Sequence, residues 1–206
     1  MRIAMVGTGY VGLVSGACFS EFGVDVVCID KIQEKIDQLV SGNIPIFEPG
    51  LESLVKANMD TGRLTFSTKM ESAVAGADAV FIAVGTPSRR GDGHADLSYV
   101  YSAAEEISDA LAGQTVIVTK TTVPVGTGDE IERRIMQRRP ELRLGEDFDV
   151  VSNPEFLREG SAIEDFMRPD RVVGGALSDY ARDVLRKLYR PLFLRDTPVL
   201  FTDRCT

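Results

Sequence analysis

Three glycines near the start of the chain have the spacing of a loop that holds phosphate groups. The segment "GTGYVG" places Gly7, Gly9 and Gly12 directly after the apolar run 2–6 and at the start of a helical pattern. In such a loop the first glycine permits a tight turn, the second lets a pyrophosphate approach the backbone, and the third lets helix and strand pack closely. The N-terminus of the helix offers free N–H groups and a favourable dipole to the phosphates. The segment therefore predicts a dinucleotide site.

An acidic residue supports this interpretation. Asp30 ends the second apolar run, at about the separation of 20 residues that the dinucleotide fingerprint requires. A carboxylate there accepts hydrogen bonds from the adenosine ribose and repels a 2′-phosphate, which favours NAD over NADP. The alternative is a glycine-rich turn in which Asp30 caps the next helix. With strand, turn, helix, strand and acid in register, we predict an NAD site.

Threonines follow two further apolar runs. Thr86 lies in the loop 84–94, and Thr121 and Thr122 lie in the loop 120–128. Loops at the carboxyl ends of parallel strands line the ligand crevice of an open sheet, although threonines there also cap helices and turns. His94, the single histidine, lacks the partners that a triad or a metal site needs, and we interpret it as a loop residue.

Two carboxylates lie four residues apart in the segment "VSNPEFLREG" (151–160), at Glu155 and Glu159. If the chain after Pro154 is helical, both carboxylates lie on one helix face. Their repulsion would then raise the pKa of one of them towards the working range. The simpler interpretation is a helix start with solvated charges.

The elements that must position these residues are predicted by the alternation of short apolar runs with helical patterns. Runs of this length, rich in Val, Ile and Phe, are typical of strands buried on both faces. The alternation predicts an α/β fold with a doubly wound, mostly parallel sheet and flanking helices. The expected strands are 2–6, 24–30, 63–68, 78–84, 114–120, 148–152, 171–175 and 198–202.

Two helices are predicted by apolar stripes. The first is expected to be capped by Asp96 and the second by Ser178. The first stripe comprises Leu97, Val100, Tyr101, Ala104, Ile107 and Leu111, and the second comprises Ala181, Val184, Leu185 and Leu188.

The composition excludes several classes of protein. A formal charge of -8 argues against a nucleic-acid binder, so the arginine-rich run 132–139 is interpreted as a solvated helix end. The 3 cysteines lack the spacing of a disulfide framework or a zinc site, which fits a reducing cytoplasm. We therefore expect no metal. We also expect no signal peptide and no membrane span, because long apolar segments are missing.

Five collinear segments carry a resemblance that spans essentially the whole chain. They are "GTGYVGLVSGACFSEFG" (7–23), "GNIPIFEPGL" (42–51), "VGTPS" (84–88), "KTTVPVGT" (120–127) and "SNPEFLREGSAI" (152–163). Together they resemble the UDP-glucose/GDP-mannose dehydrogenase family. The resemblance implies a single Rossmann-like NAD-binding domain over 1–206. It also implies an enzyme that oxidises the C6 hydroxymethyl of a nucleotide sugar to a carboxylate with two NAD.

The resemblance also implies roles for individual residues. Thr122 and Glu159 would position a catalytic water, and Glu155 would handle protons or assist hydrolysis of the acyl intermediate. The implied substrate contacts are Glu155, Phe156, Leu157 and Arg158. The implied NAD contacts are Gly7, Gly9, Tyr10, Val11, Gly12, Asp30, Lys35, Thr86, Thr121 and Glu159.

The chain departs from the family in two ways. It has Lys120-Thr121-Thr122 where the family commonly has Lys-Ser-Thr, which keeps the hydroxyl. Family members are about twice as long, and their central helix, cysteine nucleophile and UDP-sugar-binding domain are expected beyond residue 206. Cys205 lacks the nucleophile's surroundings, and Cys18 and Cys28 are expected to be packed core thiols.

We therefore expect NAD binding without turnover from the 206 residues alone, within a homodimeric or larger enzyme. UDP-glucose is the favoured substrate. GDP-mannose and UDP-N-acetyl-sugars remain open as substrates, and a non-catalytic nucleotide-binding module remains the alternative from another class.

Overall fold

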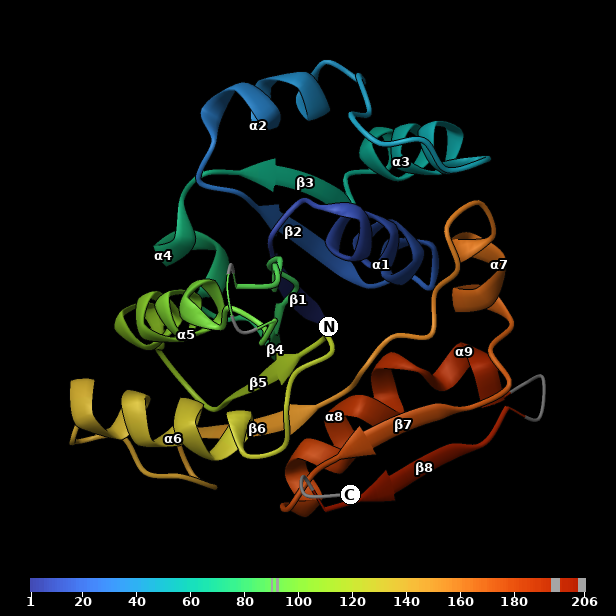
Figure 1. Cartoon of the computed structure of the whole chain (residues 1–206). Coiled ribbons are helices and arrows are strands. Elements are labelled where there is room, and N and C mark those ends of the chain that lie inside the picture. Colours follow the sequence, from blue (N-terminus) through green and yellow to red (C-terminus); the bar gives the residue numbers. More distant parts are fainter. Residues whose placement is uncertain (90, 92, 194–196, 204–206) are drawn as a thin grey trace.

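An open sheet with helices on both faces forms the body of the protein (Figure 1). The structure is a computed structural model that describes residues 1–89, 91, 93–193 and 197–203. The strands are β1 Arg2–Val6, β2 Asp25–Ile29, β3 Leu64–Ser67, β4 Ala79–Ile82, β5 Thr115–Thr119, β6 Phe148–Ser152, β7 Val172–Gly175 and β8 Val199–Thr202. The helices are α1 Tyr10–Glu21, α2 Gln33–Val40, α3 Leu51–Asp60, α4 Met70–Val74, α5 Ser98–Ala110, α6 Thr127–Arg138, α7 Ala162–Met167, α8 Asp179–Leu188 and α9 Arg190–Phe193.

The strand order confirms the predicted doubly wound, mostly parallel sheet. The order is β3-β2-β1-β4-β5-β6-β7-β8, and all eight expected strands are present within a few residues of their predicted bounds. Neighbouring strands are parallel except β6 and β7, which pair antiparallel through Ser152 and Gly175. The direction of winding reverses between β1 and β4, and in open α/β sheets ligands bind outside the carboxyl ends of the strands at this point.

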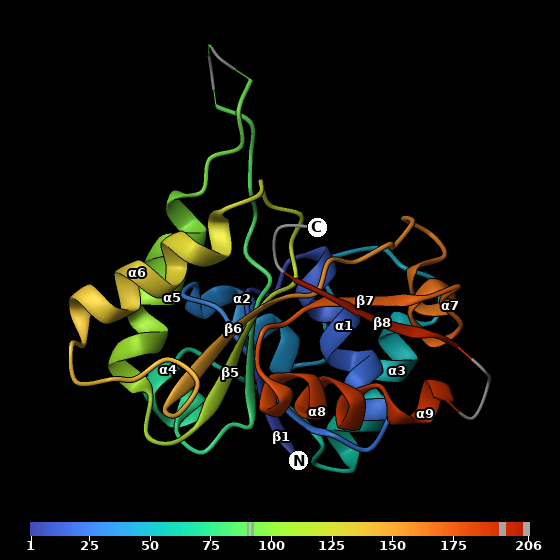
Figure 2. The same ribbon diagram turned by 90° about the horizontal axis from the view of Figure 1, so that it is seen from below.

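The sheet is buried on both faces because successive side chains of a strand point to opposite sides. In β1, Ile3 and Met5 pack into one core and Ala4 and Val6 pack into the other. Helices α1, α3, α7 and α8 cover the first face, and α4, α5 and α6 cover the second (Figure 2). These layers hold the carboxyl ends of β1, β2, β4, β5 and β6 side by side.

Both predicted helical stripes form helices. Ser178 is the N-cap of α8, and its hydroxyl accepts a hydrogen bond of 3.0 Å from the N–H of Ala181. The prediction for α5 is off by one residue, because Leu97 occupies the N-cap position. The Asp96 carboxylate nevertheless accepts the N–H of Ser98, the first residue of the helix, at 3.0 Å.

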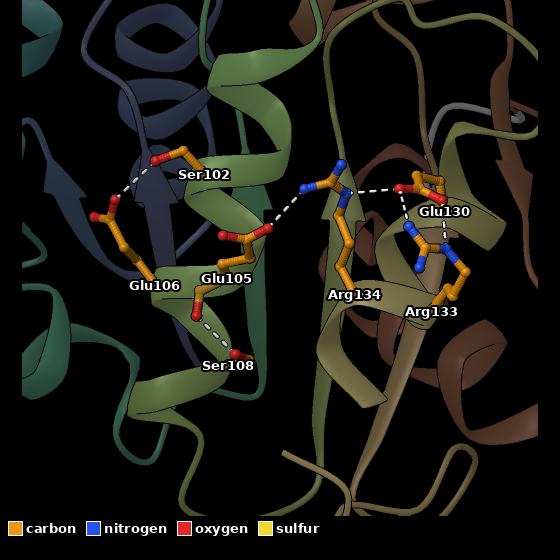
Figure 3. A network of polar contacts seen from close by, with 7 residues as sticks. All are labelled: Ser102, Glu105, Glu106, Ser108, Glu130, Arg133 and Arg134. Carbon is orange, nitrogen blue, oxygen red and sulfur yellow. Dashed lines mark hydrogen bonds and ion pairs between the residues drawn. The ribbon is translucent and has the colours of Figure 1, made fainter. Parts of the chain in front are cut away.

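The arginine-rich run forms the end of α6 as expected, but its side chains are paired rather than free in solvent. The Arg134 guanidinium lies between Glu130 of α6 and Glu105 of α5, 2.7 Å from each carboxylate (Figure 3). It also lies 4.3 Å from the centre of the Tyr101 ring. The run therefore ties α5 to α6 on one face of the sheet.

Across the described ranges, α1 to α9 include no helix that combines the length and the apolar character of a membrane span.

Candidate functional site

The glycine turn after β1 is built so that two of its glycines have no room for a side chain. Gly7 has a φ of 106°, and a Cβ atom there would lie 2.6 Å from the carbonyl oxygen of Ala83. A Cβ atom on Gly12 would lie 1.9 Å from the carbonyl oxygen of Gly7. Gly9 differs, because a Cβ atom there meets nothing within 4 Å. The turn therefore leaves open space on the outer side of Gly9, where a ligand can approach the backbone.

Helix α1 begins at this turn with its backbone donors available. Gly9 is the N-cap and has no side chain to cap the helix, and its carbonyl accepts the first helical bond from Leu13 N–H at 2.9 Å. The N–H groups of Tyr10, Val11 and Gly12 thus have no partner within the helix. The first turn of α1 carries no acidic residue. This end of α1 is suited to a pyrophosphate.

Asp30 follows β2 and is fixed beside the glycine turn. Its Oδ2 atom accepts hydrogen bonds from the Thr8 hydroxyl at 2.7 Å and from the Thr8 N–H at 3.2 Å. Its Oδ1 atom accepts the N–H of Ile32 at 3.1 Å, and Lys35 Nζ lies 3.5 Å from Oδ2. Burial opposes ionisation, but the Thr8 and Ile32 hydrogen bonds outweigh it and lower the pKa of Asp30 below its ordinary value. Asp30 therefore carries a negative charge at neutral pH.

A cavity of about 340 Å³ lies beside Asp30 and is open to solvent. Its walls come from the carboxyl ends of β1 and β2, from α4 and from the start of α5, and its volume suits an adenosine. Three residues that line it, Gly7, Asp30 and Lys35, are among the expected NAD contacts. Met70, Tyr99, Ser102 and Ala103 also line the cavity and were not predicted from the sequence.

The three candidate threonines lie at the same sheet edge in different environments. Thr86 is half-buried in the loop after β4, which projects from the edge (Figure 2). Thr121 is buried, and its Oγ1 atom has no hydrogen-bond partner among the described residues. Thr122 is exposed. A buried hydroxyl without a partner is costly, so the Thr121 side chain is free to bind a ligand atom. His94 lies in the projecting loop, as expected.

A buried lysine that we did not predict as a site residue connects β5 with β6. Lys120 Nζ lies 3.2 Å from Asn153 Oδ1 and 3.1 Å from the Tyr189 hydroxyl, which itself donates to Asn153 Oδ1 at 2.6 Å. Burial lowers the pKa of Lys120 to about 8, although the charge of Glu155 acts in the opposite direction. A cavity of about 40 Å³ is lined by both Lys120 and Glu155.

The segment after β6 corrects one prediction. Residues 153–158 have no regular secondary structure, 159–161 form a turn, and α7 begins only at Ala162. Glu155 and Glu159 therefore do not share a helix face, and the prediction that a helix brings them together is wrong. Glu159 is exposed, whereas Glu155 is half-buried and its Oε2 atom has no hydrogen-bond partner among the described residues. The two carboxylates thus have different environments.

The next three residues of this segment have distinct surroundings. The Phe156 ring is exposed and lies 5.3 Å from the Arg171 guanidinium. Leu157 packs against the core. The Arg158 guanidinium pairs with Asp165 at 2.6 Å, and the backbone N–H of Arg158 donates to the same carboxylate at 2.8 Å. The segment is therefore held through Leu157 and Asp165 while Phe156 faces outward.

A second unpredicted residue, Glu48, lies in the loop between α2 and α3. It is buried, and it accepts hydrogen bonds from the Tyr10 hydroxyl and from the N–H groups of Gly160 and Ala162. Desolvation favours the neutral form, but these hydrogen bonds prevail and lower the pKa of Glu48. Tyr10 shows the reverse effect, since burial and the hydrogen bond to Glu48 raise its pKa to about 12.

Cys18 and Cys28 are packed core thiols, as expected. Both are fully buried, and burial raises the pKa of each to about 12. Thiols of this kind are inert as nucleophiles. Cys205 lies outside the described residues. Within those residues, no group of three or more His, Cys, Asp or Glu side chains is arranged to hold a metal ion.

Comparison with known proteins gives consistent matches. Residues 1–193 match the UDP-glucose/GDP-mannose dehydrogenase family, NAD binding domain. The chain is 61% identical to a UDP-glucose 6-dehydrogenase of Rhizobium meliloti, covering 100% of the chain and 47% of the relative. It is 50% identical to a UDP-glucose 6-dehydrogenase of Bacillus subtilis, covering 98% of the chain and 42% of the relative. The chain spans about half the length of the curated relatives it matches.

Two solved structures resemble the chain closely. One is a ternary complex of GDP-mannose dehydrogenase from Pseudomonas aeruginosa, with a TM-score of 0.94 and 38% identity, which covers 100% of this chain and 47% of that one. The other is a UDP-glucose dehydrogenase from Pyrobaculum islandicum, with a TM-score of 0.91 and 39% identity, which covers 99% of this chain and 46% of that one.

Proposed function

The chain belongs to the UDP-glucose/GDP-mannose dehydrogenase family as its NAD-binding domain, and from this premise we propose that it serves the oxidation of UDP-glucose to UDP-glucuronate. The names of its relatives support this substrate. The reaction removes two hydrides from C6 and adds one oxygen from water, so it consumes two NAD.

The residues at the carboxyl edge of the sheet fit an NAD molecule. The adenosine would occupy the cavity beside Asp30, and the pyrophosphate would lie at the N-terminus of α1, over the open side of Gly9. The nicotinamide end would then lie towards Thr86 and Thr121. NAD, when bound, supplies the hydride acceptor. The other tasks fall to side chains of the protein: to orient the sugar, to accept the hydroxyl proton and to activate water.

The observation that carries this proposal is the unsatisfied carboxylate oxygen of Glu155. Its buried Oε2 atom has no hydrogen-bond partner among the described residues, and it shares a cavity wall with the Lys120 cation. A half-buried carboxylate without a donor can take a proton or orient a water. Thr122 and Glu159 are both exposed, and we propose that they hold the water that attacks the acyl intermediate.

We further propose that these 206 residues alone bind NAD without turnover. Cys18 and Cys28 are fully buried with raised pKa values, so neither provides the thiolate that nucleophilic catalysis needs. Steady NADH formation by the isolated chain with UDP-glucose would refute this part of the proposal.

A chimaera tests the proposed reaction. This chain replaces the matching half of the Rhizobium meliloti relative, to which it is 61% identical. We expect two NADH per UDP-glucose consumed. We expect Glu155→Gln to lower kcat by about 10²-fold or more, while the affinity for NAD stays within about twofold. The control, Glu52→Gln, changes an exposed residue of α3 and should leave kcat unchanged. A folded chimaera that binds NAD but does not oxidise UDP-glucose would contradict the proposal.

GDP-mannose is the second candidate substrate, because the GDP-mannose dehydrogenase structure has a TM-score of 0.94 with this chain. A non-catalytic nucleotide-binding module would bind NAD equally well, and no oxidation of either sugar by the chimaera would favour the module. The comparison of the two sugars needs the full-length protein, because the chimaera takes its sugar-binding half from a UDP-glucose 6-dehydrogenase. Oxidation of GDP-mannose faster than UDP-glucose by the full-length protein would favour the second substrate.

A further inference from the structure

Glu48 joins three parts of the chain that are distant in sequence. The carboxylate comes from the loop between α2 and α3, where only 6% of the residue is exposed. It contacts Tyr10, the first residue of α1, and Gly160, which is 112 residues further along the chain. It also contacts the start of α7, which lies beside α1 in both views of the molecule (Figures 1 and 2).

The two oxygens of Glu48 have separate partners. Oε1 accepts the backbone N–H of Ala162 at 2.8 Å and that of Ile163 at 3.5 Å. Oε2 accepts the N–H of Gly160 at 2.8 Å and the hydroxyl of Tyr10. The Gly160 N–H also points towards the Tyr10 oxygen, at 3.2 Å. A buried carboxylate with this many donors is satisfied as an anion, so the contacts act as one unit.

The contacts of Glu48 join the proposed nucleotide site at Tyr10 to the proposed catalytic segment at Gly160. Tyr10 contributes one of the backbone N–H groups at the N-terminus of α1, where the pyrophosphate is proposed to bind. Gly160 directly follows Glu159, and the same segment carries Glu155 and Phe156. Glu48 therefore links the start of α1 to the segment that carries the proposed catalytic and substrate-binding residues.

We propose that Glu48 is a positioning residue that couples occupancy of the nucleotide turn to the order of residues 158–163. This inference rests on the proposed nucleotide site at α1. When NAD fixes the first turn of α1, the Tyr10 hydroxyl is held against Glu48, and the carboxylate in turn holds the N–H groups of Gly160 and Ala162. By thermodynamic reciprocity, a ligand that orders 158–163 also strengthens NAD binding.

Hydrogen exchange of this chain with and without NAD tests the coupling. In the unmodified chain we expect saturating NAD to slow exchange at Gly160, Ala162 and Ile163 by about tenfold. Tyr10→Phe removes the hydroxyl that joins α1 to Glu48 and that also lies 3.2 Å from the Gly160 N–H. Ala162 and Ile163 keep Glu48 as their acceptor, so their slow exchange without NAD should remain and the further slowing that NAD causes should be lost. Glu48→Gln replaces one acceptor oxygen by an NH₂ group, and it should speed exchange about tenfold even without NAD.

The control and the contrary outcomes are distinct. Glu52→Gln changes a nearby exposed carboxylate and should behave as the unmodified chain. Equal NAD-dependent slowing in Tyr10→Phe and in the unmodified chain would overturn the coupling, as would a lack of slowing at 160–163 when the amides of 8–12 are protected. Protection of neither region at saturating NAD would instead show that the proposed nucleotide site is wrong, and the coupling would fall with it. If the role of Glu48 is merely structural, Glu48→Gln will speed exchange in the absence of NAD and leave the additional slowing caused by NAD unchanged.

Discussion

At the scale of single residues, the glycine turn separates the needs of folding from those of ligand binding. Gly12 is required by the fold, because its position has no space for a methyl group, whereas Gly9 borders open space and has an ordinary backbone conformation. The same residue type thus has two roles within one motif. Substitution of each glycine by alanine separates them.

We predict opposite outcomes for these two substitutions. Gly9→Ala should cost less than about 1 kcal/mol of unfolding free energy, yet weaken NAD binding by about tenfold or more, since its methyl group occupies the side where the pyrophosphate approaches. Gly12→Ala should cost about 3 kcal/mol or more, because the methyl group collides with the Gly7 carbonyl. Urea unfolding and calorimetric titration with NAD measure both effects. Equal loss of stability in the two variants would contradict this division.

Lys120 gives a pH-dependent prediction at the same scale. Its pKa is about 8 in the folded protein, below its ordinary value of 10.5. Between these two values the unfolded chain binds a proton that the folded chain does not bind, so folding becomes more favourable as pH rises. The free energy of unfolding of the unmodified chain, minus that of Lys120→Met, should increase by about 1–3 kcal/mol from pH 8 to pH 10.

The comparison with Lys120→Met is needed because other groups titrate in this range. The raised pKa values of Cys18 and Cys28 oppose the effect of Lys120, since their contribution to stability is lost as pH rises. Both thiols are present in both chains, so their effects cancel in the difference. A difference that stays flat or falls between pH 8 and pH 10 would show that the lysine is not desolvated in the folded protein.

Site residues could be predicted from the sequence where the motif is local. Gly7, Gly12 and Asp30 satisfy backbone and charge requirements within one strand-turn-helix-strand unit, so their spacing is informative. Glu48 and Lys120 act through partners that lie 33 to 115 residues away along the chain, and a sequence pattern does not show such contacts. The sequence signals that could have identified them are weak: Glu48 is a glutamate in an apolar loop, and Lys120 is a lysine at the end of an apolar run.

At the scale of elements, α5 and α6 are joined by charged side chains above their apolar contacts with the sheet. Arg134 connects the two helices through Glu105 and Glu130 and stacks on Tyr101, whereas Arg133 pairs only within α6, with Glu130 (Figure 3). The network thus contains one arginine that links elements and one that does not.

We therefore predict that Arg134→Ala destabilises the chain more than Arg133→Ala does. Arg134→Ala should cost about 1 kcal/mol at low salt, because it removes an interhelical pair and a cation–π contact, and part of this cost should disappear in 1 M salt. Thermal unfolding at two salt concentrations measures the effect. Equal loss in both variants would mean that the link between helices contributes nothing.

The strands could be predicted closely from the sequence, and the segment after β6 could not. The strands are buried on both faces, so their apolar runs are continuous and easily recognised. Asn153 does not start a helix, because its N–H donates to the carbonyl of Thr119 in the neighbouring strand and because a residue before proline is disfavoured in helical conformation. The charges of this segment suggested a helix, but the N–H groups of Arg158 and Gly160 instead donate to the carboxylates of Asp165 and Glu48.

At the scale of the whole molecule, the doubly wound sheet gathers distant loops at one edge. The glycine turn, Asp30, the Thr121 loop and the segment 153–163 follow four different strands, yet all lie at the carboxyl ends near the point where the winding reverses. The doubly wound, mostly parallel sheet could be inferred from the alternation of elements, whereas the order of its strands was not predicted. The antiparallel pairing of β7 with β6 could not be predicted, because the connection between these strands contains α7 and has no hairpin signal.

The proposed site at this edge binds NAD with Asp30 against the adenosine ribose. Calorimetric titration of the chain with NAD and with NADP at pH 7 tests this arrangement. Because Asp30 is ionised there, it should repel a 2′-phosphate, and we predict NAD binding with NADP weaker by at least about tenfold. Equal affinity for the two nucleotides, or no heat of binding with NAD, would contradict the account.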